Sequence, residues 1–364
     1  MMQHKSILIM AGGTGGHVFP ALAVARCLMA QGVPVSWLGT AAGIECRLVP
    51  GDGIDLHLID VRGIRGKGIG TLLCAPVIML KALIQALLAM RRLRPGVALG
   101  MGGFVSGPGG IAAWLLGIPL IIHEQNAIPG LSNRILSLVA AVVLEGFPGV
   151  FRGNKSQYTG NPVRSDIAGL RPPELRLRSR GSAGLQLLVL GGSQGAQVLN
   201  QVLPELSRQL GREMDLRVWH QAGERHYAGT CDAYRQSGVD PQKVRVVPFI
   251  EDMAAAYDWA DLVICRSGAL TLAELCVAGI ASILIPYPHA VDDHQTANAK
   301  RMVAHGCAIL IPECGLDLCK LAEIVTDFSR IREKLIEMAR RARELAKPDA
   351  ASAVASFCLE YRNA

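Results

Sequence analysis

The sequence predicts an α/β protein with two domains, each a doubly wound parallel β-sheet covered by helices. First, short apolar segments alternate with helical stretches in both halves of the chain, which is the pattern of a parallel sheet. Second, each half has a glycine loop, at 12–16 and 191–195, set between an apolar segment and a helical one. Third, the length of 364 residues suffices for two domains of ordinary size.

Six apolar segments of the first half have the length and composition of buried strands. A helix is expected over 21–31, after the first glycine loop. The expected strands are Ile7–Met10, Val35–Leu38, Leu56–Asp60, Val97–Leu99, Leu120–Ile122 and Val142–Leu144.

A segment poor in apolar residues separates the two halves. It contains Pro172-Pro173 and Gly181-Ser182-Ala183-Gly184, which is typical of an interdomain connection. We therefore expect domains at 1–163 and 164–345, with a C-terminal helix over 346–364 that returns to the first domain. The expected strands of the second half are Leu187–Leu190, Leu216–His220, Val244–Val247, Leu262–Cys265 and Ile283–Ile285.

The composition favours a cytosolic protein with reduced cysteines. Half of the residues are hydrophobic and 18% are charged, far from the composition of an integral membrane protein. The ten cysteines are scattered, without a CxxC pair or zinc-type spacing, and most lie in apolar runs, so we expect buried thiols. The first six residues precede only five apolar ones, which is too short for a secretory signal.

The positive charge is confined to the first half. Residues 1–163 contain 13 Lys and Arg against 6 Asp and Glu, a net charge of +7, whereas residues 164–364 contain 24 of each. A basic half is typical of proteins that meet nucleic acid, an anionic membrane or an anionic substrate. Nucleic acid is disfavoured because aromatic residues make up only 5%, the basic residues are dispersed and no known motif occurs.

The apolar segment 72–90 has about the length of a membrane span, roughly 20 residues. Lys81 at its centre disfavours a span, because a charge at the middle of a membrane is costly. A core helix and a helix with one membrane-facing side both remain open. In the second case, polar substitutions of Leu80, Leu83 and Leu87 are expected to weaken binding to vesicles.

The two glycine loops have the features of anion sites. A phosphate can approach a backbone that lacks Cβ atoms, and free N–H groups and the helix dipole then stabilise its charge. The first loop is not a dinucleotide fingerprint, because no acidic residue ends the second strand. The stretch 63–68 lacks the hydroxyl residue that a P-loop requires after its lysine. A further glycine-rich stretch at 100–109 follows another strand.

His17 ends the first loop at the start of a helix. The positive end of a helix dipole lowers the pKa of a histidine and favours neutral imidazole, which can accept a proton. A hydrogen bond to a phosphate or to the backbone is the alternative role.

Polar side chains cluster after three further strands, where α/β sheets bind ligands. His123-Glu124-Gln125-Asn126 follows one strand, and Ser267-Gly268 opens a helix after another. Glu274, two turns into that helix, can accept hydrogen bonds from both hydroxyls of a ribose. Asp292-Asp293 with His294 suggests a metal, but a ligand-facing helix is the favoured interpretation, so no metal site is expected.

Seven motifs in this order resemble the MurG family of N-acetylglucosaminyltransferases, glycosyltransferase family 28. The similarity extends over nearly the whole chain, and the ordered set is very specific. The motifs are AGGTGGHVFP (11–20), GMGGFVSGPG (100–109), HEQN (123–126), GNPVR (160–164), GGSQGA (191–196), CRSGALTLAE (265–274) and HQTAN (294–298).

The resemblance implies the GT-B fold, two Rossmann-like domains separated by a deep cleft. It implies a hexosyltransferase that moves N-acetylglucosamine with inversion from UDP-N-acetylglucosamine to the 4-hydroxyl of lipid I, forming lipid II of peptidoglycan. Lipid I binds the first domain and the UDP-sugar binds the second. No cofactor is implied, and stimulation by Mg²⁺ through screening of the substrate phosphates stays open.

The resemblance also implies a location and partners. The protein is expected to lie peripherally on the cytoplasmic face of the inner membrane, with its basic first domain against anionic lipid. Cell-wall synthesis and division proteins are further expected partners.

Site residues follow from the matching motifs. In the first domain, Thr14, Gly15 and Gly16 are expected close to both substrates, and His17 is the candidate general base that removes the proton of the acceptor hydroxyl.

The implied donor site lies largely in the second domain. Glu274 is expected to hold the ribose hydroxyls, the backbone of Ile250 to read the uracil edge, and Gln295 to contact the sugar hydroxyls. The other residues expected at the donor are Asn126, Arg164, Ser193, Ala269, Leu270, Thr271, Leu272 and Ala273.

This chain departs from the family pattern at two places. Phe104 stands where one member of the family has tyrosine, so a hydroxyl there is not expected to be essential here. One extra residue lies between His289 and Gln295, so no role is assigned to Asp292 or Asp293. Two enzymes of the same fold stay as alternatives: a UDP-N-acetylglucosamine 2-epimerase and a diacylglycerol glycosyltransferase.

Overall fold

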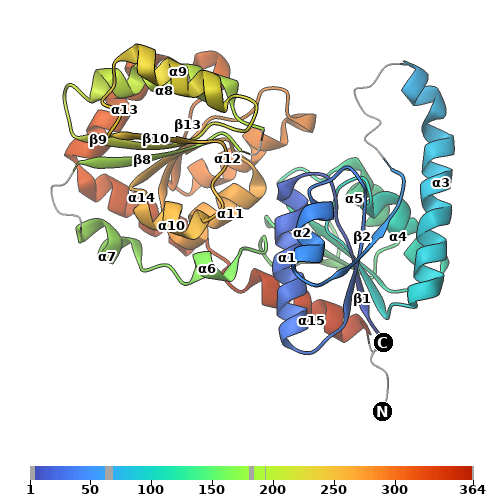
Figure 1. The fold of residues 1–364 in the computed structure, drawn as a ribbon. Coiled ribbons are helices and arrows are strands. Elements are labelled where there is room, and N and C mark those ends of the chain that lie inside the picture. Colours follow the sequence, from blue (N-terminus) through green and yellow to red (C-terminus); the bar gives the residue numbers. More distant parts are fainter. Residues whose placement is uncertain (1–4, 62–68, 180–183, 193, 363–364) are drawn as a thin grey trace. The chain divides into compact units, whose positions relative to one another are not determined.

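The computed structural model describes residues 5–61, 69–179, 184–192 and 194–362. The chain forms two compact units (Figure 1). The first consists of Met1–Arg164 together with Lys347–Ala364, and the second of Ser165–Ala346. The C-terminal helix α15 (Ala350–Arg362) therefore belongs to the first unit, where it packs against α1 (Gly15–Ala30).

The first unit is built on a seven-stranded parallel sheet of order β3-β2-β1-β4-β5-β6-β7. All neighbouring strands are parallel, which agrees with the alternation of strands and helices in the sequence. The strands are β1 (Ile7–Met10), β2 (Val35–Gly39), β3 (Asp55–Leu58), β4 (Val97–Gly100), β5 (Leu120–Glu124), β6 (Val142–Glu145) and β7 (Ser156–Tyr158).

Helices cover both faces of this sheet, because alternate residues of a strand point to opposite sides. Ile7 and Ile9 contribute to a core shared with α1 and α15, and Leu8 and Met10 to a second core with α3 and α4. Figure 1 shows these helix pairs on opposite faces. The remaining helices are α2 (Glu45–Gly51), α3 (Ile69–Leu93), α4 (Ser106–Leu115) and α5 (Leu131–Leu136).

The second unit is built on a six-stranded parallel sheet of order β10-β9-β8-β11-β12-β13. The strands are β8 (Leu185–Leu190), β9 (Leu216–Gln221), β10 (Val244–Val247), β11 (Leu262–Cys265), β12 (Ala281–Leu284) and β13 (Ala308–Leu310). The helices are α6 (Ser165–Ala168), α7 (Pro173–Arg178), α8 (Gln197–Leu210), α9 (Tyr227–Ser237), α10 (Met253–Trp259), α11 (Ala269–Ala278), α12 (His294–Ala304), α13 (Leu318–Arg330) and α14 (Arg332–Glu344), with short 3₁₀ turns η1 (Val291–Asp293) and η2 (Glu313–Gly315).

Several boundaries differ from the sequence predictions. Helix α1 starts at Gly15, six residues before the predicted start, so the glycine loop itself supplies its first turn. The two edge strands β7 and β13 were not predicted, because each has three residues and β7 reads Ser-Gln-Tyr. Buried thiols were predicted, but only four of the nine described cysteines are buried, and Cys314 and Cys319 are exposed.

The segment predicted as an interdomain connection packs onto the second unit. The guanidinium of Arg176, on α7, is buried and donates hydrogen bonds to the carbonyl oxygens of Ala278 (3.0 Å) and Gly279 (2.7 Å). These carbonyls end α11, where a cation is favourable to the helix dipole. Residues 165–179 are thus part of the second unit rather than a free linker.

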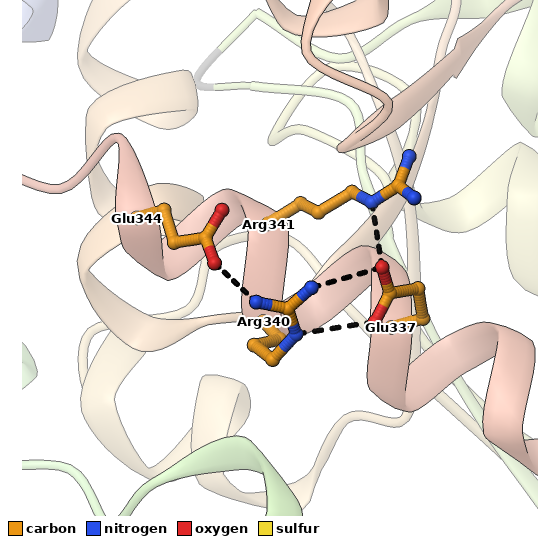
Figure 2. Close-up of polar contacts among 4 residues, drawn as sticks. All are labelled: Glu337, Arg340, Arg341 and Glu344. Carbon is orange, nitrogen blue, oxygen red and sulfur yellow. Dashed lines mark hydrogen bonds and ion pairs between the residues drawn. The ribbon is translucent and has the colours of Figure 1, made fainter.

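Helix α14 shows how a polar helix is held in this unit. On its solvent side Glu337 accepts hydrogen bonds from Arg340 and Arg341, and Arg340 also pairs with Glu344 (Figure 2). Such exposed pairs contribute little to stability, because water and salt screen them. The helix is held chiefly by its buried side chains, which are Leu335, Ile336, Ala339 and Ala342.

Candidate active site

Both glycine loops lie at the switch point of their sheet. In the first sheet β1 is flanked by β2 and β4, and in the second β8 is flanked by β9 and β11. At such a point the chain leaves neighbouring strands in opposite directions, and parallel sheets bind ligands outside the carboxyl ends of those strands. The loops after β1 and β4, and after β8 and β11, therefore define one candidate binding site in each unit.

The first loop leads directly into α1. Thr14 is the extended residue before the helix, and Gly15, Gly16 and His17 form its first turn. The first amides of a helix have no carbonyl partner within it, and they carry the positive end of the dipole. Thr14, Gly15, Gly16 and His17 are therefore brought together as an anion-binding turn.

The glycines of this unit divide into open and packed positions. A Cβ on Gly13 would meet no atom within 4 Å, and one on Gly16 would approach only Thr14 Oγ1, at 3.8 Å. By contrast, a Cβ on Gly103 would lie 2.2 Å from the carbonyl oxygen of Gly12, and one on Gly102 would lie 2.5 Å from the His17 ring. The stretch 100–109 thus packs beneath the first loop, which leaves the first loop as the open surface.

Hydrogen bonds to the strand ends fix the same region. The Met101 amide donates to the Met10 carbonyl (2.9 Å), and the buried Ser106 hydroxyl lies within hydrogen-bond distance of that carbonyl (3.0 Å). The indole N–H of Trp37 donates to the carbonyl of Ala11 (2.8 Å). The first loop is thus held from both neighbouring strands.

The 123–126 motif supports the site mainly from inside. Glu124 is buried, and its Oε1 accepts hydrogen bonds from the backbone (3.0 Å) and side-chain (3.2 Å) nitrogens of Asn126. Gln125 Nε2 donates to the carbonyl of Met101 (2.7 Å). Asn126 is half-buried, whereas the other three residues of the motif are buried. A ligand can therefore reach Asn126 but not the other three.

His123 is wholly buried and has a structural position. Its Nε2 lies 2.9 Å from the carbonyl oxygen of Gly160, to which it can donate. Burial lowers the pKa of its imidazole, which favours the neutral form of the ring.

Arg164 lies beside the first loop through an aromatic side chain. Its guanidinium carbon is 5.5 Å from the centre of the Phe19 ring, and a Cβ on Gly15 would lie 2.9 Å from that ring. Arg164 thus places a cation next to the start of α1, within the first unit.

The second glycine loop has a single open position among its described glycines. A Cβ on Gly191 or Gly195 would collide with backbone atoms, at 2.7 Å and 2.3 Å, whereas one on Gly192 would meet nothing within 4 Å. Gly192 also has a φ of +78°, which favours glycine. Ser193, predicted at the donor, lies outside the described residues.

Helix α11 presents a second anion-binding turn. Gly268 precedes it, and Ala269 to Ala273 form its first turns. The buried hydroxyl of Ser267 donates to the carbonyl of Gln295 (2.8 Å), and the Asn298 amide donates to the carbonyl of Ser267 (3.2 Å). The start of α11 is therefore tied to α12, which carries Gln295.

Glu274 is buried and held by a residue that the sequence reasoning missed. The phenol of Tyr257, on α10, donates to Glu274 Oε2 (2.9 Å). A carboxylate fixed in this way is a well-positioned acceptor for ligand hydroxyls. No motif signals Tyr257, because it lies 17 positions before Glu274 in the sequence.

Ile250 is tied to the second loop by another missed residue. Its backbone N–H donates to Oε1 of the buried Gln221 (3.0 Å). The carbonyl of Gln221 in turn accepts from the amide of Gly191 (3.1 Å). Gln221 thus couples the segment after β10 to the glycine loop after β8.

The segment before α12 has an unusual backbone. Asp292 and Asp293 have φ values of +53° and +51°, which non-glycine residues rarely adopt. Gln295 Oε1 accepts from the amide of Tyr287 (2.9 Å). Among the described residues, no three His, Cys, Asp or Glu side chains lie close enough together to hold a metal ion.

The helices α3, α4 and α5 of the first unit expose a set of large apolar side chains. Leu80, predicted with Leu83 and Leu87 to face a membrane, is exposed, whereas Leu83 and Leu87 are partly buried and pack against the core. No described helix is long and apolar enough to cross a membrane. The exposed apolar residues of these helices and the turn after α5 are Val77, Leu80, Ile84, Leu88, Trp114, Leu115, Leu131, Ile135 and Leu138.

Polar residues of α3 are used within the unit. Lys81 Nζ lies 2.8 Å from Asp60 Oδ2, and Gln85 Nε2 donates to the same oxygen (3.0 Å). Lys81, at the centre of α3, therefore ties this helix to Asp60, two residues after the end of β3.

Comparison with known families identifies both halves of the chain. Residues 7–144 match the glycosyltransferase family 28 N-terminal domain, and residues 186–354 match the glycosyltransferase family 28 C-terminal domain. The two matches together cover most of the chain and correspond to the two units of the structure.

Full-length relatives and a solved structure agree with this. The chain is 51% identical over 360 residues to the UDP-N-acetylglucosamine–N-acetylmuramyl-(pentapeptide) pyrophosphoryl-undecaprenol N-acetylglucosamine transferase of Marinobacter nauticus, covering 99% of this chain and 98% of that one. It is 52% identical to the protein of that name from Nitrosococcus oceani, covering 97% and 98%. The crystal structure of Acinetobacter baumannii MurG superposes with a TM-score of 0.82 at 42% identity, covering 98% of this chain and 99% of that one.

Proposed function

This chain belongs to glycosyltransferase family 28, and from that premise we propose that it is a hexosyltransferase that moves N-acetylglucosamine from UDP-N-acetylglucosamine to N-acetylmuramyl-(pentapeptide) pyrophosphoryl-undecaprenol, lipid I. The observation that carries the proposal is identity of about half of all residues, over nearly full length, to transferases of that name. The product is lipid II, the disaccharide precursor of peptidoglycan.

The second unit binds the UDP-sugar. The carboxylate of Glu274 accepts hydrogen bonds from the ribose hydroxyls, and the backbone of Ile250 reads the uracil edge. The amides of Ala269, Leu270 and Thr271, in the first turn of α11, bind the diphosphate with Ser193. Leu272 and Ala273 line the same site, and Gln295 binds the sugar hydroxyls. The buried position of Glu274 and its bond from Tyr257 support this assignment, because a fixed acceptor loses little freedom on binding.

The first unit binds the acceptor. The amides of Gly15 and Gly16 and the hydroxyl of Thr14 lie where an acceptor phosphate gains from the dipole of α1. Asn126 and Arg164 add a neutral and a cationic group that contact the donor. The open backbone at Gly13 and Gly16 supports this placement.

The reaction inverts the anomeric carbon. The acceptor 4-hydroxyl attacks that carbon while its proton passes to a ring nitrogen of His17, and the bond to the diphosphate breaks with its electron pair on the leaving UDP. The negative charge on UDP is stabilised by backbone amides and the dipole of α11. Within this scheme no cofactor is required, and any stimulation by Mg²⁺ comes from screening of the substrate phosphates.

The protein acts as a peripheral protein at the cytoplasmic face of the inner membrane. The exposed apolar side chains of α3, α4 and α5 support this, together with the exposed Arg91, Arg92, Arg94 and Arg134 on the same unit. Basic residues near an anionic surface contribute about 1 kcal/mol each. Cell-wall synthesis and division proteins are the partners this location implies.

Release of UDP from UDP-N-acetylglucosamine, with and without a lipid I analogue, tests the proposal. Acceptor-dependent release, with one N-acetylhexosamine added to the analogue by mass, is the expected result. Turnover without acceptor to an isomer of equal mass would instead indicate a 2-epimerase. Transfer to diacylglycerol in place of the analogue would indicate a glycolipid synthase of the same fold.

A further inference from the structure

A buried carboxylate lies directly behind the first glycine loop. Glu45, the first residue of α2, has no exposed surface. Its Oε2 accepts a hydrogen bond from the amide of Gly13 (3.0 Å), and its Oε1 accepts from the amide (2.9 Å) and the hydroxyl (2.8 Å) of Thr40. A buried carboxylate needs such donors, because its charge is otherwise costly to remove from water.

Three glycines make room for this side chain. A Cβ on Gly12 would lie 2.6 Å from Glu45 Oε1, one on Gly39 2.9 Å from its Cγ, and one on Gly43 1.9 Å from its Oε2. A Cβ at any of these three positions would force the buried Glu45 side chain to move. Glycine at 12, 39 and 43 therefore accommodates the carboxylate in its present position.

Glu45 determines which amides of the loop remain for a ligand. The Gly13 amide is already bonded to Glu45, and it points inward. The amides of Gly15 and Gly16 follow at the start of α1, where the helix supplies no carbonyl partner. The carboxylate thus separates an inward amide from the outward amides of the same turn.

A chain of tight contacts runs from Glu45 to His17. The backbone of Gly12, beside the carboxylate, packs so closely against Gly103 that a Cβ on Gly103 would collide with the Gly12 carbonyl oxygen. The neighbouring Gly102 has its own Cβ position filled by the His17 ring. Movement of Gly12 and Gly13 would therefore shift the surface on which the His17 ring rests.

We propose that Glu45 is a positioning residue for the transfer reaction: its buried carboxylate sets the first glycine loop, and through it His17, in the reactive geometry before the acceptor binds. The inference rests on the proposed function, since it concerns the rate of that reaction. Glu45 touches no substrate and acts through the loop. A displacement of about 1 Å in a reacting group can lower a rate about 100-fold.

The variant Glu45→Gln tests the proposal. Glutamine replaces one of the two carboxylate oxygens with an NH₂ group, which cannot accept a hydrogen bond, so the side chain can no longer accept from both Gly13 and Thr40. We expect kcat to fall about 10- to 100-fold, with KM for UDP-N-acetylglucosamine within twofold of wild type. The matched control is Glu145→Gln, a second buried carboxylate of the same unit, which accepts from the amides of Gly149 (2.9 Å) and Phe151 (2.6 Å). Its kcat should stay within about threefold.

A second readout does not depend on activity. In protein labelled with ¹⁵N-glycine, the Gly13 amide should be protected from hydrogen exchange in wild type and in Glu145→Gln, and should lose protection in Glu45→Gln. If Glu45→Gln does not fold, Thr40→Val, which removes one donor, should lower kcat about 2- to 5-fold. Unchanged kcat in a folded Glu45→Gln, or an equal loss in both glutamine variants, would overturn the proposal.

Measurements on the wild-type protein distinguish a failure of the positioning role from a failure of the proposed function. If wild type does not transfer the sugar, the proposed function fails, whereas the exchange of Gly13 still reports whether Glu45 holds the loop. If wild type transfers and Glu45→Gln matches it, only the positioning role fails.

Discussion

The phenol of Tyr257 and the carboxylate of Glu274 form a buried hydrogen bond of 2.9 Å between α10 and α11. Glu274 belongs to a motif that predicted its role, whereas Tyr257 belongs to no motif. Because the tyrosine holds one oxygen of the carboxylate, the orientation of Glu274 toward a ligand is set before binding. The affinity for the donor should therefore depend on a residue outside the motif.

Tyr257→Phe removes this hydrogen bond and keeps the ring. We expect KM for UDP-N-acetylglucosamine to rise about 10- to 150-fold, since a hydrogen bond to a charged group contributes roughly 1.5–3 kcal/mol. The value of kcat should change less than threefold, because Glu274 binds the ribose in both ground and transition states. Steady-state kinetics at saturating acceptor measures both constants.

The control for this variant is Tyr234→Phe. Tyr234 is also buried in the second unit, but it lies on α9, away from α11. Its hydroxyl lies 3.1 Å from Nδ1 of His220, on β9. It should lose stability without a change in donor KM. A similar rise of KM in both variants would assign the effect to general loosening of the unit.

His17→Ala tests the candidate base. Removal of a general base lowers rates by about 10²- to 10⁴-fold, and we expect kcat to fall within that range while binding of UDP stays within twofold. Binding should persist because the proposed contacts to the uracil, the ribose and the diphosphate of UDP lie in the second unit. Rapid-quench transfer assays and calorimetry with UDP provide the two measurements.

His305→Ala is the matched control. His305 is exposed, and its ring nitrogen Nδ1 lies 2.8 Å from the carbonyl oxygen of Arg301, four residues earlier in the chain. It should retain wild-type kcat. If His17→Ala keeps more than half of the wild-type kcat, another group accepts the proton.

Much of the fold follows from the sequence because apolar segments and glycines mark the strand ends. The two glycine loops and the start of α11 lie at strand ends, as the sequence pattern predicts, and Glu274 follows within α11. Glu45, Gln221 and Tyr257 did not emerge, because each acts by a hydrogen bond to a residue distant in sequence. A polar residue inside a short apolar helix gives the same local signal whether it is buried and bonded or exposed.

The stability of the second unit should depend on pH through His220. Burial lowers the pKa of His220 to about 3, below the value of about 6.5 in an unfolded chain. The unfolded state therefore binds the proton first, so the stabilisation is complete above pH 6.5 and is lost as the pH falls toward 3. The free energy of unfolding should drop by about 2 kcal/mol between pH 7 and pH 5 from this residue.

Urea unfolding followed by tryptophan fluorescence measures this slope, since Trp219 and Trp259 belong to the same unit. His220→Gln cannot titrate and should show a flatter dependence on pH, although it starts from a lower stability at pH 7. Equal slopes in both proteins would show that other groups govern the acid sensitivity. His123, whose pKa burial also lowers, should act in the same direction in the first unit.

The exposed apolar stripe of α3 should determine membrane binding. Replacing Leu80, Ile84 and Leu88 with serine removes apolar surface that already faces solvent, so folding is retained while insertion into the lipid interface is lost. We expect at least about a 10-fold weaker partition onto anionic vesicles in sedimentation assays, given about 1.5–3 kcal/mol for each buried aliphatic side chain. Serine at the exposed Leu175 and Ile331 of the second unit is the control and should leave partition unchanged. Undiminished binding of the folded triple variant would assign membrane attachment to another surface.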